Sequence, residues 1–104
     1  MDGPEVFLEH VDVSRETFEK LEIYANLLLR WQFKINLIST NSLKQAWHRH
    51  FLDSAQIFSI LPKKATSAID VGTGAGFPGL VLSIMGLENV QLVEQNKKKM
   101  CFFI

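Results

Sequence analysis

Three alternating glycines, Gly72, Gly74 and Gly76, directly follow an apolar run that predicts a strand over residues 67–71. Glycine allows the backbone to turn back with positive φ, and a ligand can approach the chain closely because no Cβ stands in the way. The next residues predict a helix over 80–85, whose first unpaired N–H groups would point toward a bound molecule. This spacing indicates a loop that binds a nucleotide-like ligand.

Two carboxylates accompany this loop. Asp70 lies near the end of the first predicted strand, and Glu94 ends a second predicted strand over residues 90–94. In nucleotide-binding α/β folds, an acid at the end of the second strand accepts hydrogen bonds from the ribose hydroxyls of an adenosine. An acid in the position of Asp70 suits a cofactor that carries a free amino group. We therefore expect both side chains at a cofactor site.

The glycines allow two interpretations. Gly74, Gly76 and Gly79 satisfy the G-x-G-x-x-G pattern of dinucleotide-binding domains, which would indicate an oxidoreductase. From Gly72 onward, the segment Asp-Val-Gly-Thr-Gly-Ala-Gly resembles motif I of S-adenosylmethionine-dependent methyltransferases. The register favours the methyltransferase, because a dinucleotide pattern begins where the strand ends, and its third glycine would then fall on Phe77. A glycine-rich turn without a ligand is the remaining alternative.

Two helices precede the loop and must position it. From Ser14 onward, side chains recur on one face at steps of three and four, which predicts a helix to about residue 32. The residues of this face are Phe18, Leu21, Ala25, Leu28 and Gln32. A second helix is predicted over residues 42–61, where Pro62 would end it. Residues 1–13 show no period, and we expect a loose acidic lead-in there.

Composition excludes several classes of protein. With 104 residues, 47% hydrophobic and 21% charged, the chain is typical of a globular domain and not of a disordered or fibrous one. The single cysteine excludes an internal disulfide and a multi-cysteine zinc site, and we expect no metal site. We expect no signal peptide and no membrane-spanning run, because the first residues are acidic and no apolar stretch is long enough. We therefore expect a cytoplasmic protein without a membrane partner, and we expect it to be a monomer.

The formal net charge of zero combines two unequal parts. Residues 1–22 hold seven acidic and two basic residues, whereas residues 23–104 hold nine basic and four acidic ones. The acidic segment thus carries −5 and the remainder +5. A basic body of this kind is compatible with an RNA partner.

Three segments taken together resemble one family. They are Trp-Gln-Phe-Lys-Ile-Asn-Leu-Ile-Ser at 31–39, Arg-His-Phe-Leu-Asp-Ser at 49–54, and the loop at 70–79, which ends in Phe-Pro-Gly. They are similar to successive signatures of the bacterial small-subunit ribosomal RNA guanine-N7 methyltransferases, the glucose-inhibited division B family. The resemblance covers about residues 20–102, and the Phe-Pro-Gly ending is more diagnostic than the glycines.

This resemblance implies a Rossmann-like sheet that binds S-adenosylmethionine, and methyl transfer to a guanine of small-subunit rRNA. The implied partner is that RNA or the ribosomal subunit. By the same resemblance, Gly72 and Phe77 contact the cofactor, Gly74 and Gly76 shape the loop, and Glu94 holds the ribose. We assign no catalytic residue, because guanine N7 has a free lone pair and no proton to lose. Orientation of the two reactants would then supply the catalysis.

Four further residues match family positions near the cofactor pocket or the RNA face: Asn36, Arg49, His50 and Asp53. Structural roles compete with these assignments. Asn36 would then only satisfy backbone groups at a helix end. His50 and Asp53 would form a local pair that fixes helix packing.

The expected fold class is α/β, with an N-terminal helical region over 1–66 and the first βαβ portion of a methyltransferase domain over 67–104. Two five-residue strands fall short of the usual four to six strands of a sheet. Members of the family also continue well beyond this length. We therefore expect a truncated chain, and an inactive remnant of the methyltransferase is an alternative to an active enzyme.

Overall fold

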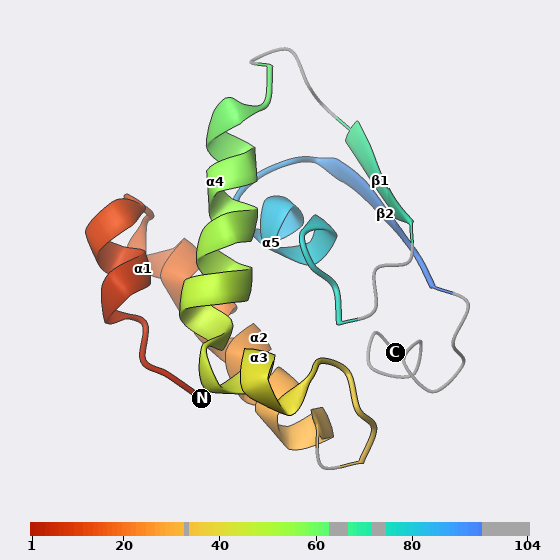
Figure 1. The fold of residues 1–104 in the computed structure, drawn as a ribbon. Coiled ribbons are helices and arrows are strands. Elements are labelled where there is room, and N and C mark those ends of the chain that lie inside the picture. The colour runs from red at the N-terminus through yellow and green to blue at the C-terminus, as the bar shows by residue number, and fades with distance from the viewer. Residues whose placement is uncertain (33, 63–66, 72–74, 95–104) are drawn as a thin grey trace.

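The structure is a computed structural model of the chain, and it describes residues 1–32, 34–62, 67–71 and 75–94 (Figure 1). Helices and strands follow one another in this order: α1 (Glu5–His10), α2 (Arg15–Gln32), α3 (Thr40–Lys44), the π-helical segment η1 (Trp47–Phe51), α4 (Leu52–Ile60), β1 (Ser67–Val71), α5 (Gly79–Ile84) and β2 (Asn89–Val93). Helices therefore occupy the first part, and a βαβ unit follows. This confirms the α/β class.

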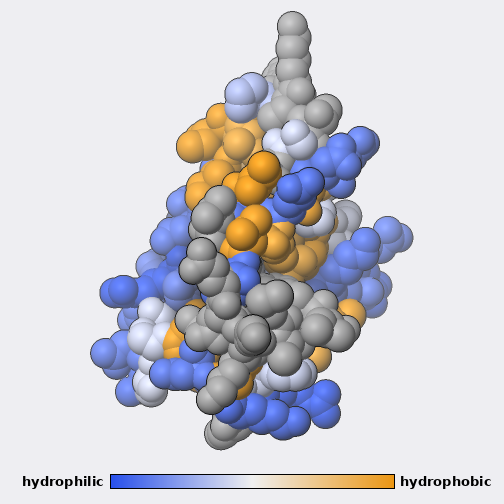
Figure 2. All heavy atoms as spheres, turned by 90° about the vertical axis from the view of Figure 1, so that its right-hand side faces the viewer, coloured by the Kyte–Doolittle hydropathy of each residue, from blue (hydrophilic) through white to orange (hydrophobic). Residues whose placement is uncertain are grey.

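The two strands pair in parallel, with Ser67 opposite Asn89 and Val71 opposite Val93. Helix α5 connects them and lies between α4 and the strands (Figure 1). Because side chains alternate along a strand, Asp70 and Leu92 face α5 whereas Ile69 and Val93 point to the opposite face. Ile69 and Val93 are exposed, and hydrophobic side chains gather on this side of the molecule in Figure 2.

Gly79 allows α5 to lie close to the strands. A Cβ added at this position would lie 2.5 Å from Leu92 Cδ2 and 2.9 Å from Asp70 Cβ. Beyond this contact, α5 buries Val81 and Leu82. The start of the helix is thus fixed against the end of β1, where the glycine loop begins.

A single hydrophobic core joins the helices to the βαβ unit. Its largest fully buried side chains are Phe7, Leu21, Leu28, Phe51 and Val81. They come from α1, α2, η1 and α5. The predicted boundary after residue 66 adjoins residues that the structure does not describe, and the division into two regions stays a prediction. The core is continuous on both sides of it.

Helix α2 confirms the predicted first helix. It covers Arg15–Gln32, and the Ser14 hydroxyl caps it by accepting a hydrogen bond from the Thr17 N–H at 3.1 Å. This 18-residue helix is not apolar enough to cross a membrane, and no other helix in the described ranges is long enough to do so.

The prediction for residues 1–13 was wrong. They include α1, whose Phe7 is fully buried and meets the Trp47 ring edge-on at a centroid distance of 5.5 Å. The carboxylate of Asp2 accepts hydrogen bonds from the backbone N–H groups of Trp47 (2.9 Å) and His48 (3.1 Å). A helix of six residues is too short to show a period, so tertiary packing determines this segment.

The second predicted helix is divided into three parts, which corrects the prediction of one continuous helix. The Ser39 hydroxyl caps α3 by accepting from the Ser42 N–H. The π-helical segment η1 then widens the helix for one turn, a feature found often at functional sites. Within it, the Trp47 and Phe51 rings stack at 4.4 Å on the core side. The apolar spacing predicted that Trp47 and Phe51 share a face. It did not predict the wider turn, because residues four apart share a face in both an α-helix and a π-helix.

We expect Asp2→Ala to lower the free energy of unfolding by about 1 kcal/mol, the usual effect of losing a helix-capping side chain. The change removes the acceptor for two N–H groups of η1. Urea denaturation followed by circular dichroism measures it. Glu9→Ala is the control, because Glu9 is an exposed carboxylate on α1. Equal losses in the two variants would show that the Asp2 contact does not stabilise η1.

Candidate functional site

The end of the glycine loop is held by a backbone conformation that requires glycine. Gly76 has a φ of 101°, which other residues rarely adopt, and its carbonyl accepts the Leu80 N–H at 2.7 Å as α5 begins. Gly72 and Gly74, both predicted to contribute to the site, lie outside the described residues. Their roles stay predictions.

Tyr24 of α2 anchors this loop. Its hydroxyl donates a 2.5 Å hydrogen bond to the Ala75 carbonyl, and both residues are buried. Burial first, and then the negative charge of Asp70, raise the pKa of Tyr24 well above its ordinary value. The phenol therefore stays protonated as a donor. Tyr24 was not predicted as a site residue, although its position three after Leu21 and four before Leu28 places it on the buried face of α2.

Asp70 connects the two ends of the loop. Its Oδ2 accepts a hydrogen bond from the Gly79 N–H at 2.9 Å, so the carboxylate at the end of β1 holds the first turn of α5. The parallel pairing of β1 and β2 places Asp70 and Glu94 at the same edge of the sheet. Glu94 is half-buried there, immediately after β2. Contact of either residue with a cofactor stays a prediction.

Phe77 brings the loop and the helices together. Its ring stacks on Tyr24 (centroids 5.3 Å, 26°) and on His50 (4.8 Å, 22°), and it meets Phe51 edge-on at 5.2 Å. Aromatic pairs at these separations stabilise the fold by more than the burial of their apolar surface alone would give. Two predicted site residues that lie far apart in the sequence, Phe77 and His50, are therefore in direct contact.

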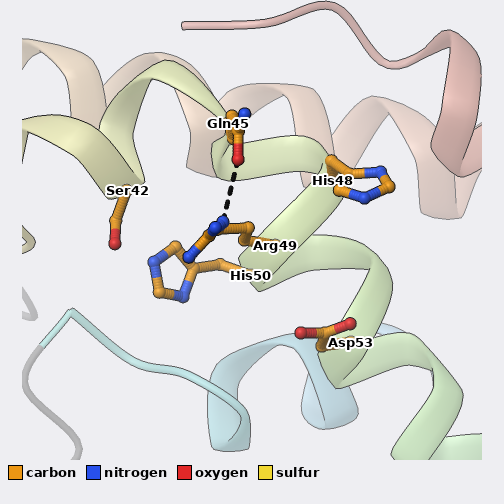
Figure 3. A pocket seen from close by; sticks show the side chains of 6 residues that line it. All are labelled: Ser42, Gln45, His48, Arg49, His50 and Asp53. Carbon is orange, nitrogen blue, oxygen red and sulfur yellow. Dashed lines mark hydrogen bonds between the residues drawn. The ribbon is translucent and has the colours of Figure 1, made fainter.

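A pocket of about 470 Å³ opens beside this stack (Figure 3). The residues that line it are Ser42, Gln45, His48, Arg49, His50 and Asp53. Figure 3 shows the Arg49 guanidinium beside the His50 ring, with the His48 ring extending the other way. Arg49 Nε donates to Gln45 Oε1 at 2.8 Å, which fixes the direction of the guanidinium. Three of the four residues predicted near the cofactor or the RNA therefore share one pocket: Arg49, His50 and Asp53.

The imidazole of His50 carries a buried atom that is not paired within the described part of the chain. Its Nε2 is buried and has no hydrogen-bond partner among the described residues. Burial lowers the pKa of His50, Asp53 partly opposes this, and Arg49 lowers it further. The imidazole is therefore neutral near pH 7. In the described contacts the Phe77 stack fixes His50, with no hydrogen bond to Asp53. A buried polar atom of this kind calls for a partner such as a ligand.

Asn36 lies outside this pocket. Its Oδ1 accepts a 2.6 Å hydrogen bond from Gln32 Nε2, and the Gln32 amide also binds backbone groups of Leu37 and Ile38. Gln32 thus organises the turn after α2, and Asn36 supports it. Asn36 therefore has a structural contact with a side chain, whereas Gln32, which the sequence predicted only as part of the α2 face, meets the backbone groups that the structural alternative assigned to Asn36. A direct role for Asn36 toward a ligand stays a prediction.

Among the described residues, no group of three or more His, Cys, Asp or Glu side chains is placed to hold a metal ion. The donors that the site offers are backbone N–H groups, hydroxyls, imidazoles and a guanidinium, with Asp53, Asp70 and Glu94 as acceptors. Such a set suits an organic ligand with both polar and charged groups.

The described part of the chain is an α/β protein in which a glycine-rich segment follows the first strand. The family model described as rRNA small subunit methyltransferase G (GidB) matches residues 17–104, and the chain belongs to this family.

Relatives with the name ribosomal RNA small subunit methyltransferase G agree with this assignment. The protein of Rhodospirillum rubrum is 50% identical over 101 residues, which are 97% of this chain and 50% of that protein. The relative from Paramagnetospirillum magneticum is 48% identical over 96% of this chain and 49% of its own length. The relative from Rickettsia prowazekii is 48% identical over 88% of this chain and 48% of its own length. The chain therefore spans about half the length of these relatives.

We expect Tyr24→Phe to lower the free energy of unfolding by about 1–3 kcal/mol, because the buried Ala75 carbonyl loses its donor. Chemical denaturation measures the change. Ser59→Ala is the matched control, since it deletes an exposed hydroxyl that also donates to a backbone carbonyl, that of Gln56 at 2.7 Å. A loss no larger than in the control would contradict the anchoring role of Tyr24.

We expect His50 to titrate below 6.5, the ordinary pKa of histidine. The folded state favours the neutral imidazole, so unfolding is promoted by protonation. Stability is therefore complete above about pH 6.5 and falls as the pH drops through the lower pKa of the folded state. NMR titration of the ring protons, assigned by loss of the signal in His50→Gln, measures the pKa. A value at or above 6.5 would contradict the burial of the ring.

Proposed function

We propose that this chain belongs to an S-adenosylmethionine-dependent methyltransferase that methylates N7 of a guanine in small-subunit rRNA. Family membership and the names of the relatives support the reaction class. The proposed fold is a Rossmann-like methyltransferase sheet, of which β1, α5 and β2 are the first portion. We further propose the small ribosomal subunit as partner, a monomeric state, and a cytoplasmic location.

The observation that carries this proposal is that the loop and two carboxylates lie at one edge of the sheet. The loop, Asp70 and Glu94 lie at the carboxyl ends of two parallel strands, where open α/β sheets bind their ligands. The polar pocket adjoins that edge through the contact of His50 with Phe77. The positive φ of Gly76 and the unpartnered Nε2 of His50 fit a polar ligand at this place.

The chain's own residues would bind and orient. Gly72, Gly74, Gly76 and Phe77 would hold the cofactor at the loop, Glu94 would bind the ribose hydroxyls, and Asp70 would face the amino group. When bound, S-adenosylmethionine supplies an electrophilic methyl group on its sulfonium. Guanine N7 needs no base to attack it, so we assign no catalytic base to the chain. The remaining task is alignment of the two reactants in a pocket from which water is excluded.

A dinucleotide-binding oxidoreductase is the second candidate, and one observation favours it. Gly79 packs α5 closely on the strands, as the third glycine of a dinucleotide fingerprint does. The same close contact serves a methyltransferase, and the family match favours that function. The two candidates differ in the ligand that each must bind.

Isothermal titration with S-adenosylhomocysteine and with NAD distinguishes these candidates. We expect the chain to bind S-adenosylhomocysteine and not NAD, with an affinity well below that of a full-length relative, because the chain spans about half of that length. Gly76→Ala should weaken binding. Gly86→Ala is the matched control, because Gly86 also has a positive φ (123°) but has no neighbour within 4 Å of an added Cβ. Binding of NAD alone would refute the methyltransferase proposal.

Transfer of a labelled methyl group to isolated small ribosomal subunits tests the reaction itself. Label at guanine N7 is the result that we expect from an active chain. Binding of S-adenosylhomocysteine without any transfer would instead support the inactive remnant.

A further inference from the structure

The pocket beside Phe77 carries both signs of charge. Arg49 supplies a guanidinium and Asp53 a carboxylate, and both line the same cavity of about 470 Å³. The two residues are four positions apart along η1 and α4, and no ion pair between them is found in the described part of the chain. Charges of opposite sign that share a pocket without pairing suit a ligand that carries both a negative and a positive group.

Arg49 is oriented for a carboxylate. Its Nε is engaged by Gln45 Oε1 at 2.8 Å, and this contact directs the guanidinium while its two terminal amino groups remain at the pocket. Two adjacent N–H donors of this kind match the two oxygens of a carboxylate. The buried Nε2 of His50 lies on the same side and provides a further polar group.

We propose that this pocket binds the α-amino-acid end of the cofactor. Arg49 would bind the carboxylate, Asp53 would bind the ammonium group, and His50 Nε2 would complete the hydrogen bonding. The stack of His50 on Phe77, at 4.8 Å, places this pocket directly beside the loop. The inference rests on the proposed use of S-adenosylmethionine, and it adds the residues that recognise the amino acid.

An RNA phosphate is the competing occupant. A phosphate site needs donors and positive charge, and the carboxylate of Asp53 in the lining would repel the phosphate. A zwitterionic ligand uses Asp53 as well as Arg49. The mixed charge therefore favours the amino-acid end of the cofactor.

Two ligands that differ only at this end provide the test. S-adenosylhomocysteine carries the amino acid, whereas 5′-methylthioadenosine keeps the adenosine and the thioether without it. We expect the 104-residue chain to bind S-adenosylhomocysteine more tightly, measured by NMR titration. Arg49→Gln and Asp53→Asn should each weaken it about tenfold, the effect of one charged hydrogen bond. Neither variant should change the affinity for 5′-methylthioadenosine. Arg15→Gln is the control, because Arg15 is an exposed arginine at the start of α2.

The outcomes separate this inference from the proposed function. If the chain binds neither ligand, the proposed cofactor is wrong, and the inference is wrong with it. If both ligands bind equally well and Arg49→Gln changes neither affinity, the cofactor stands but the pocket does not recognise its amino acid. If Arg49→Gln weakens only the binding of a short RNA oligonucleotide, the pocket is a phosphate site and the inference is overturned.

Discussion

The contact between the glycine loop and the helical part is the interaction on which this site depends. Phe77 stacks on Tyr24 and His50, while the Tyr24 hydroxyl holds the Ala75 carbonyl. The packing of α5 on α2 and α4 supports the same arrangement, and these contacts add the direct link between the loop and the polar pocket. The same contacts extend one hydrophobic core from α1 to α5. The aromatic residues therefore stabilise the core and position the site at the same time.

This packing also determines where η1 places its polar side chains. The π-helical turn η1 directs Trp47 and Phe51 to the core, leaves Arg49 exposed beside the pocket and holds His50 half-buried on Phe77. Asp2, about 45 residues earlier in the sequence, accepts hydrogen bonds from two backbone N–H groups of this turn. The acidic N-terminal segment thus contributes to the position of residues that line the pocket. Burial of His50 then keeps its imidazole neutral, as a hydrogen-bonding group.

Much of this arrangement could be predicted from local signals. The βαβ order followed from a glycine loop between two short apolar runs, and the strand at 67–71 coincides with β1. The apolar period revealed the face of α2. The remaining features depend on contacts that are distant in sequence. The six residues of α1 show no period, η1 differs from an α-helix by one wider turn, and Tyr24 gains its importance from a carbonyl 51 residues away. Motif resemblance named Arg49, His50 and Asp53, but only the fold shows that they line one pocket and that Asn36 lies outside it.

The central claim is that the loop and the segment from Gln45 to Asp53 form a single ligand site. Backbone amide NMR of the chain during titration with S-adenosylhomocysteine tests this most directly. The account predicts that the amide signals of residues 75–77 and 79 and of residues 45–53 shift together, with one common dissociation constant. Shifts confined to the loop, or centred on the separate pocket lined by Leu29, Arg30, Trp31 and Lys34, would contradict it.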